Sequence, residues 1–198
     1  MFDWIKNINK EQPEFWKNYV SKFDEKSKRY IILSTKTTGK NPTKDVILSF
    51  GALAIINDNI VINDSFEVML LQYIYLHDNG LSNEFIIKSK LPKLSEFDAM
   101  QAFLMFIGNS VLIGHNIHFD VDIINHTLEK YGCGRLKNQA LDIEIMHEKL
   151  LEISDRKFSL EELCMAYKVP YDDSQSASED AYSMALLFLK LKSKLGLE

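Results

Sequence analysis

The spacing of apolar residues divides the chain into a strand-forming first third and a helix-forming remainder. Residues 29–33 (RYIIL) form a short, apolar, β-branched run. The longer apolar runs at residues 46–56 and 60–70 flank Asn57-Asp58-Asn59, a sequence typical of a tight turn. This pattern predicts three strands, of which the second and third form a hairpin.

After residue 70 the apolar positions follow helical spacing, interrupted by one short buried strand predicted at residues 111–113. Ser95 is placed to cap a helix, and Ser159 with Glu162 forms the capping-box pattern that opens another. Further helices are predicted at residues 119–131, 143–152 and 178–195. Strands alternating with and followed by helices indicate an α/β protein with a mixed sheet covered by helices.

The segment before the first strand predicts one more helix. Residues 13–23 (PEFWKNYVSKF) carry five large apolar residues at helical spacing. We expect this amphipathic helix to pack on its own domain, and a helix that binds a partner protein is the alternative. The predicted organisation is a helical extension at residues 1–28 and one domain at residues 29–198.

Composition excludes several classes of protein. Hydrophobic residues make up 46% and charged residues 26% of the 198 residues, as in ordinary globular domains, which excludes a disordered chain. The longest apolar run, residues 46–56, is too short to span a bilayer, and the N-terminus lacks the pattern of a signal peptide. Cys133 and Cys164 form no C-x-x-C pair, so we expect no disulfide or structural zinc and a cytoplasmic location.

The charge balance argues against tight, sequence-blind binding of nucleic acid. The net charge is −5, and only three of the 23 basic residues are arginine. Overall acidity opposes phosphate at long range, and few arginines leave few bidentate phosphate contacts.

Polar residues interrupt apolar surroundings at a few positions. Ser34 and Lys36 end the first strand and should point to one side of the sheet, with Thr35 on the other. Asp120 and Asp180 each lie at the start of a predicted helix. Taken singly, each aspartate is explained by stabilisation of a helix N-terminus.

Taken together, three segments resemble a known family. STKTTG at 34–39, GHNIHFD at 114–120 and QSASEDA at 175–181 follow the order and spacing of the motifs of the DnaQ-like DEDD-type (DEDDh) 3′–5′ exonucleases. This family includes RNase T and the proofreading subunit of the bacterial replicative polymerase. The resemblance extends over about residues 29–195.

The resemblance implies a ribonuclease H-like α/β fold, with a mixed five-stranded sheet flanked by helices, and hydrolysis of DNA or RNA from the 3′ end. In the family, four carboxylates hold two Mg²⁺ or Mn²⁺ ions and a histidine is the general base. Asp120 and Asp180 are the retained carboxylates and metal positions, whereas Ser34, Lys36 and Gln175 replace the motif-one Asp, the motif-one Glu and the base. The positions implied to contact a terminal nucleotide are Thr37, Thr38, Gly39, His115, Asn116 and Phe119.

These replacements change the charge of the site. Four family carboxylates sum to −4, whereas Ser34, Lys36, Asp120 and Asp180 sum to −1. We expect Lys36 to pair with Asp120, Asp180 or both and so to take the place of a metal ion. The sequence does not support a rescue by neighbouring acids: Asp122 and Glu179 should face away. Asp142 could lie close to the site, but we expect it to cap the following helix.

The sequence therefore predicts an exonuclease-family domain with impaired catalysis. We expect it to bind nucleic-acid 3′ ends or a protein partner, with no cofactor and no membrane contact. The alternative is an active 3′–5′ exonuclease that uses Mg²⁺ or Mn²⁺ in an unusual site. A zinc site at His115 and His118 lacks further ligands nearby, and Ser34 lies outside the pattern of a serine hydrolase.

Overall fold

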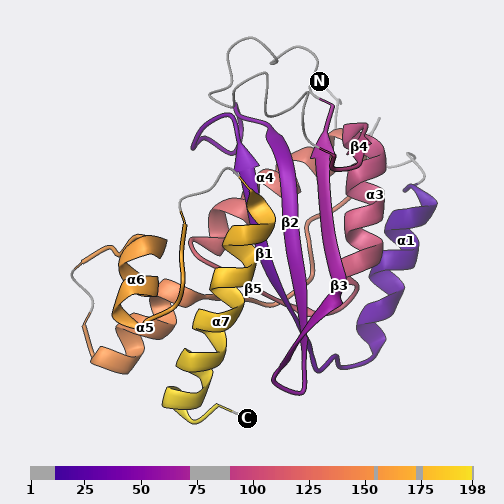
Figure 1. Cartoon of the computed structure of the whole chain (residues 1–198). Helices are drawn as coiled ribbons and strands as arrows, with labels where there is room; N and C mark the ends of the chain where they lie inside the picture. Colours follow the sequence, from indigo (N-terminus) through magenta and orange to yellow (C-terminus); the bar gives the residue numbers. More distant parts are fainter. Residues whose placement is uncertain (1–11, 72–89, 154–155, 173–175, 198) are drawn as a thin grey trace, which may run out of the picture.

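A mixed six-stranded sheet forms the centre of the molecule (Figure 1). The computed structural model describes residues 12–71, 90–153, 156–172 and 176–197. The strand order is β4-β3-β2-β1-β5-β6, with β1–β2 and β2–β3 antiparallel and the other pairs parallel. The strands are β1 (Arg29–Thr37), β2 (Ile47–Ile56), β3 (Asn59–Leu70), β4 (Lys93–Leu94), β5 (Val111–Gly114) and β6 (Ala140–Asp142).

The predicted α/β class and mixed sheet are confirmed, with two differences in the strands. The described residues contain six strands instead of five, because the two-residue β4 pairs with the end of β3. The first strand extends to Thr37 and not to residue 33, because its polar end pairs with the buried strand β2. Pairing with a neighbour holds residues 34–37 in the sheet although their own sequence is polar.

Helices cover both faces of this sheet. They are α1 (Glu14–Val20), α3 (Glu96–Ile107), α4 (Ile117–Lys130), α5 (Ile143–Leu151), α6 (Leu160–Ala166) and α7 (Ala177–Leu195), with a 3₁₀ turn at Ser21–Asp24 after α1. The predicted caps are confirmed. The Ser95 hydroxyl accepts a hydrogen bond from the Asp98 amide, and Ser159 with Glu162 forms a complete capping box.

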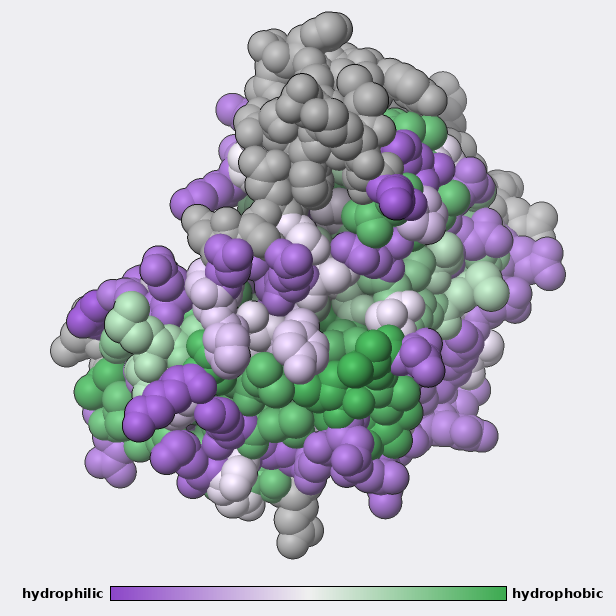
Figure 2. Space-filling model, viewed as in Figure 1, coloured by the Kyte–Doolittle hydropathy of each residue, from purple (hydrophilic) through white to green (hydrophobic). Residues whose placement is uncertain are grey.

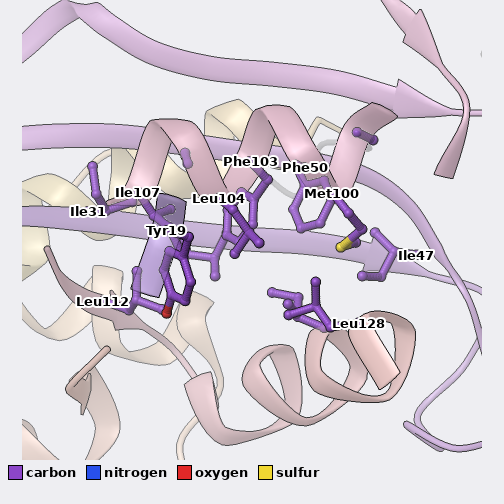
Figure 3. Packing of buried hydrophobic residues seen from close by; sticks show 14 of the residues in the cluster. Tyr19, Ile31, Ile47, Phe50, Met100, Phe103, Leu104, Ile107, Leu112 and Leu128 are labelled. Atoms are coloured by element: carbon purple, nitrogen blue, oxygen red, sulfur yellow. The ribbon is translucent and has the colours of Figure 1, made fainter. Parts of the chain in front are cut away.

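Two hydrophobic cores lie on opposite faces of the sheet. In one, α1, α3 and α4 pack on the sheet, and Phe103 stacks on Phe50 with ring centroids 4.5 Å apart (Figure 3). The other is formed with α5, α6 and α7, and Phe188 of α7 is its largest fully buried side chain. Leu33 belongs to the first core and Ile32 to the second, as the alternation of side chains along a strand requires.

The face that carries α7 is not uniform in polarity (Figures 1 and 2). A green, hydrophobic area lies below the middle of this face and is bordered by purple residues, whereas the part above it, where β1 ends and α7 begins, is white to purple and hence more polar. None of the described helices is long and apolar enough to cross a membrane.

Helix α1 is part of the first core. Trp16 and Tyr19 are 3% and 1% exposed. The Tyr19 hydroxyl donates to Asn138 Oδ1 at 2.5 Å and accepts from the Lys137 amide at 2.8 Å. The expectation that this helix packs on its own domain is therefore confirmed. The boundary at residue 28 stays a prediction.

Removal of the Trp16 side chain tests how much this helix contributes to stability. Trp16→Ala leaves a cavity against the first core, and we expect it to lower the free energy of unfolding by about 3–5 kcal/mol. Ile62→Ala, at a side chain that is 70% exposed, is the control and should change it by no more than about 0.5 kcal/mol. Urea denaturation measures both. Equal values for the two variants would show that α1 is not part of the folded core.

Candidate functional site

The end of strand β1 presents its polar side chains to two different faces of the sheet. Since Ile32 packs on the α7 side and Leu33 on the α3 side, Ser34 and Lys36 face α7 and Thr35 faces α4. This confirms the side-chain alternation predicted from the sequence. The motif-one positions thus stand opposite the N-terminal turns of α7.

Lys36 forms an ion pair with Asp180, in the first turn of α7. The Lys36 Nζ lies 2.7 Å from Asp180 Oδ2, a distance at which the ammonium donates a charge-assisted hydrogen bond. The two side chains are only 23% and 11% exposed, so water screens the pair less than it screens a surface pair. The sequence predicts that Lys36 pairs with Asp120, Asp180 or both, and the structure shows the ion pair with Asp180.

A glycine allows α7 to lie close to the sheet. Gly51 on β2 pairs with Ser34 on β1, and the first turn of α7 lies directly on it. A Cβ atom at this position would lie 2.2 Å from the Ala177 carbonyl carbon and 2.3 Å from the Ser178 nitrogen. Only a residue without a side chain allows this approach, which places Asp180 within reach of Lys36.

Asp120, the other retained carboxylate, lies in the first turn of α4. It is 7% exposed, and its Oδ1 accepts a hydrogen bond from the Thr35 hydroxyl. Its pKa is raised to about 7, chiefly by burial; the hydrogen bonds from Thr35 oppose this rise, and the negative charge of Asp142 adds a smaller part of it. This carboxyl group therefore changes its charge near neutral pH.

Asp142 joins two helices to the sheet. Its Oδ1 accepts from the Glu144 amide at 2.8 Å, which caps α5 as predicted. Its Oδ2 accepts from the Ile117 amide at 3.0 Å, at the start of α4. Sequence reasoning missed this second bond because the helix it serves begins 25 residues earlier. Both oxygens of this carboxylate accept hydrogen bonds from backbone amides.

Two further acids next to the retained aspartates are exposed. Asp122 forms an exposed salt bridge with Arg135, with 2.9 Å between Oδ1 and Nη2. Glu179 is exposed on α7, next to Asp180. Asp122 is therefore engaged away from Lys36.

The hydroxyl groups of Thr37, at the end of β1, and of Thr38, in the following loop, form hydrogen bonds within this segment. The Thr37 hydroxyl donates to the Gly39 carbonyl at 2.8 Å, and the Thr38 hydroxyl donates to Asp45 Oδ1 at 2.9 Å. Gly39 allows Asp45 to pack closely, since a Cβ there would lie 2.7 Å from Asp45 Oδ1. These contacts close the turn, and a role for Thr37, Thr38 and Gly39 in nucleotide contact stays a prediction.

The second motif is held partly by a contact with the segment before α6. His115 Nε2 lies 2.7 Å from the Phe158 carbonyl oxygen, and because a carbonyl only accepts, this nitrogen carries the proton. Asn116 is exposed with a left-handed backbone (φ 56°), and Phe119 packs against the first core. Their contact with nucleotide also stays a prediction. Gln175 lies outside the described residues.

The side chains described at these positions do not fit a two-metal centre. In the ranges that the structure describes, no three His, Cys, Asp or Glu side chains are arranged to hold a metal ion. The motif-one positions offer a hydroxyl and an ammonium group, and the ammonium is bonded to a carboxylate that a metal would need. Mg²⁺ and Mn²⁺ prefer oxygen ligands that carry compensating negative charge.

Comparison with known proteins identifies relatives of this chain. Residues 31–188 match the exonuclease family RNase_T. The DNA polymerase III subunit epsilon of Buchnera aphidicola is 31% identical over 181 residues, which cover 82% of this chain and 72% of that protein. The PolC-type DNA polymerase III of Lacticaseibacillus paracasei is 24% identical, covering 84% of this chain and 11% of that protein. The chain thus spans about a tenth of its PolC-type relative.

Solved structures give the same fold. Exonuclease I of Methylocaldum szegediense superposes with a TM-score of 0.66 at 14% identity, covering 86% of this chain and 42% of that chain. Exonuclease I of E. coli in complex with a dT13 oligonucleotide gives the same TM-score, identity and coverage.

The raised pKa of Asp120 predicts a pH dependence of stability. Its folded pKa of about 7 lies above its ordinary value of 3.8, so its contribution is largest below pH 4 and is lost as the pH rises to 7. Asp120→Asn removes this titration. Relative to the variant, the wild type should lose about 3 kcal/mol of unfolding free energy between pH 5 and pH 8.

Urea denaturation of both proteins at the two pH values measures this difference. Asp122→Asn, two residues along the same helix and in an exposed salt bridge, is the matched control and should follow the wild-type profile. Parallel profiles for the wild type and Asp120→Asn would contradict the assignment.

Proposed function

Because this chain belongs to the RNase_T exonuclease family, we propose that it is an exonuclease domain with impaired hydrolysis that binds nucleic-acid 3′ ends or a protein partner. The observation that carries the proposal is the ion pair of Lys36 with Asp180, 2.7 Å long. It brings a fixed positive charge to a carboxylate that the family uses for metal.

The chemistry of phosphodiester hydrolysis explains why this ion pair matters. Two divalent ions clamp the attacking water and the leaving oxygen, and they need several carboxylate oxygens to hold them together. An ammonium group beside Asp180 repels a divalent ion about as strongly as a carboxylate at the same distance attracts it. One of the two retained carboxylates is thereby cancelled, and Ser34 supplies only a neutral hydroxyl.

Proton transfer is impaired independently of the metal ions. The position of the family's histidine base is Gln175, whose amide cannot accept a proton at neutral pH. The amide could still orient a water molecule, but the proton of that water would have no acceptor at this position. General-base catalysis contributes about 10²–10⁴-fold, so its loss alone lowers the rate severely.

The two kinds of binding partner both occur among relatives. Exonuclease I has been solved with a dT13 oligonucleotide and with SSB-Ct, and the epsilon relatives are named as subunits of DNA polymerase III. The 3′ end is supported by the retained second motif and by Asp180 of the third, and the protein partner by the net charge of −5. A working metal-dependent exonuclease is the competing function.

Nuclease assays with matched variants distinguish the two. We expect the wild type to shorten 5′-labelled single-stranded DNA or RNA in Mg²⁺ or Mn²⁺ no faster than Asp120→Asn/Asp180→Asn. The triple variant Ser34→Asp/Lys36→Glu/Gln175→His restores the family residues and should gain at least about 100-fold in rate.

One outcome of the same assay would contradict the proposal. Shortening by the wild type that the Asp120→Asn/Asp180→Asn variant abolishes would mean that two carboxylates suffice, and the impaired-site proposal would be wrong. Circular dichroism of each variant confirms that a missing activity does not come from unfolding.

A further inference from the structure

We infer that helices α1 and α3 form a docking surface for a second copy of this chain, which binds antiparallel to the first across a two-fold axis. The two helices lie side by side at one edge of the molecule (Figure 1). Between them is an open groove with a volume of about 480 Å³. This surface belongs to the side of the sheet that carries the first core, away from α7 and the Lys36–Asp180 ion pair, so it goes beyond the proposed function.

Two contacts show that α1 and α3 run in the same direction. At the start of both helices, the rings of Phe15 and Phe97 meet edge to face with centroids 5.4 Å apart. At the other end, Lys22 Nζ donates a hydrogen bond to the Met105 carbonyl oxygen at 3.3 Å. The groove therefore has two distinct ends. A helical rise of about 1.5 Å per residue separates Phe97 from Met105 by about 12 Å along the axis.

The two ends of the groove carry opposite charges. Glu14 lines the first end and Lys22 the second, and both side chains are exposed. Within the described residues neither side chain forms an ion pair, and the Lys22 ammonium bonds to a backbone carbonyl. A copy rotated by half a turn about an axis through the middle of the groove places its own Lys22 opposite Glu14 and its own Glu14 opposite Lys22. Both ion pairs form together, because such an interface contains every contact twice.

The middle of the groove suits the two-fold axis itself. Asn18 and Gln101 line the groove there, about one helical turn from each end. At a two-fold axis a side chain meets its own copy, so a charged residue would repel itself. An amide carries both donors and an acceptor and can therefore pair with an identical amide. The order of acid, amide and base along the groove is the order that an antiparallel pair requires.

Exposed apolar side chains follow the same symmetry. Phe97 is 38% exposed at the first end, and Met105 is 64% exposed at the second. The rotation places Met105 of the second copy near Phe97, where a thioether and an aromatic ring attract each other. Burial of these side chains stabilises the dimer, whereas exposed ion pairs alone contribute little.

Sedimentation velocity of the full chain over a range of concentrations tests the inference. We expect a monomer–dimer equilibrium, which Met105→Ser weakens about tenfold because apolar contact is lost at two symmetric places. Glu14→Lys and Lys22→Glu should each weaken it about tenfold, because each reversal creates two like-charge contacts per dimer. Lys44→Glu changes the charge of an exposed lysine in the loop after β1 by the same amount as Lys22→Glu. It is the matched control and should leave Kd unchanged.

Two combinations separate this pairing from a general effect of charge. The double variant Glu14→Lys/Lys22→Glu reverses both ends and stays self-complementary, so it should dimerise with the Kd of the wild type. An equimolar mixture of the two single variants should form a mixed dimer. In that mixture one chain carries lysine at both positions and the other carries glutamate at both, so each chain repels its own copy and attracts the other chain.

Three outcomes would overturn the inference. A monomer at the highest concentration reached leaves the groove to a different partner. A dimer that both single reversals leave unchanged uses another surface. Reversals that neither combination rescues exclude the antiparallel pairing. Circular dichroism of each variant excludes loss of folding as the cause, and none of these results depends on nuclease activity, so the proposed function is tested separately.

Discussion

The close approach of α7 to strand β2 at Gly51 determines the geometry of the candidate site. A side chain at Gly51 would overlap the backbone at Ala177 and Ser178, so the helix could not lie where it does with any larger residue. Because β1 is the neighbour of β2, this approach also brings the first turn of α7 over the end of β1. The contact between Lys36 and Asp180 follows from it.

The two retained aspartates have different partners because β1 alternates its side chains between two faces. Lys36 faces α7 and meets Asp180 as an ion pair, whereas Thr35 faces α4 and donates to Asp120. One carboxylate is neutralised by an ammonium, and the other is so buried that its pKa is raised to about 7. The family's fold is kept, and we propose that the charges that would attract two divalent ions are not.

The sequence predicted the features that local spacing encodes. Alternation along the strands, the hairpin at Asn57–Asn59 and the serine caps each depend on residues close together in the chain. The pairing of Lys36 with one of two aspartates was also predictable, because the motif spacing of a known fold brings these positions together. For these features, the residue types and their order along the chain were sufficient for a correct prediction.

The rest depends on contacts between distant segments. Strand β4 has two residues and β6 three, which is too short for any periodic signal, and Asp142 bonds to an amide 25 residues away. The bond between His115 and Phe158 spans 43 residues and could not be read from either segment. Such contacts follow only from the packed structure, and they place the polar groups around the site.

The central claim is that Lys36 stands in the place of metal charge, and titration with Mn²⁺ tests it most directly. Electron paramagnetic resonance counts bound Mn²⁺ ions per chain without requiring catalysis. We expect the wild type to bind no more Mn²⁺ than Asp120→Asn/Asp180→Asn does at millimolar metal. Two ions per wild-type chain that this double variant loses would contradict the account.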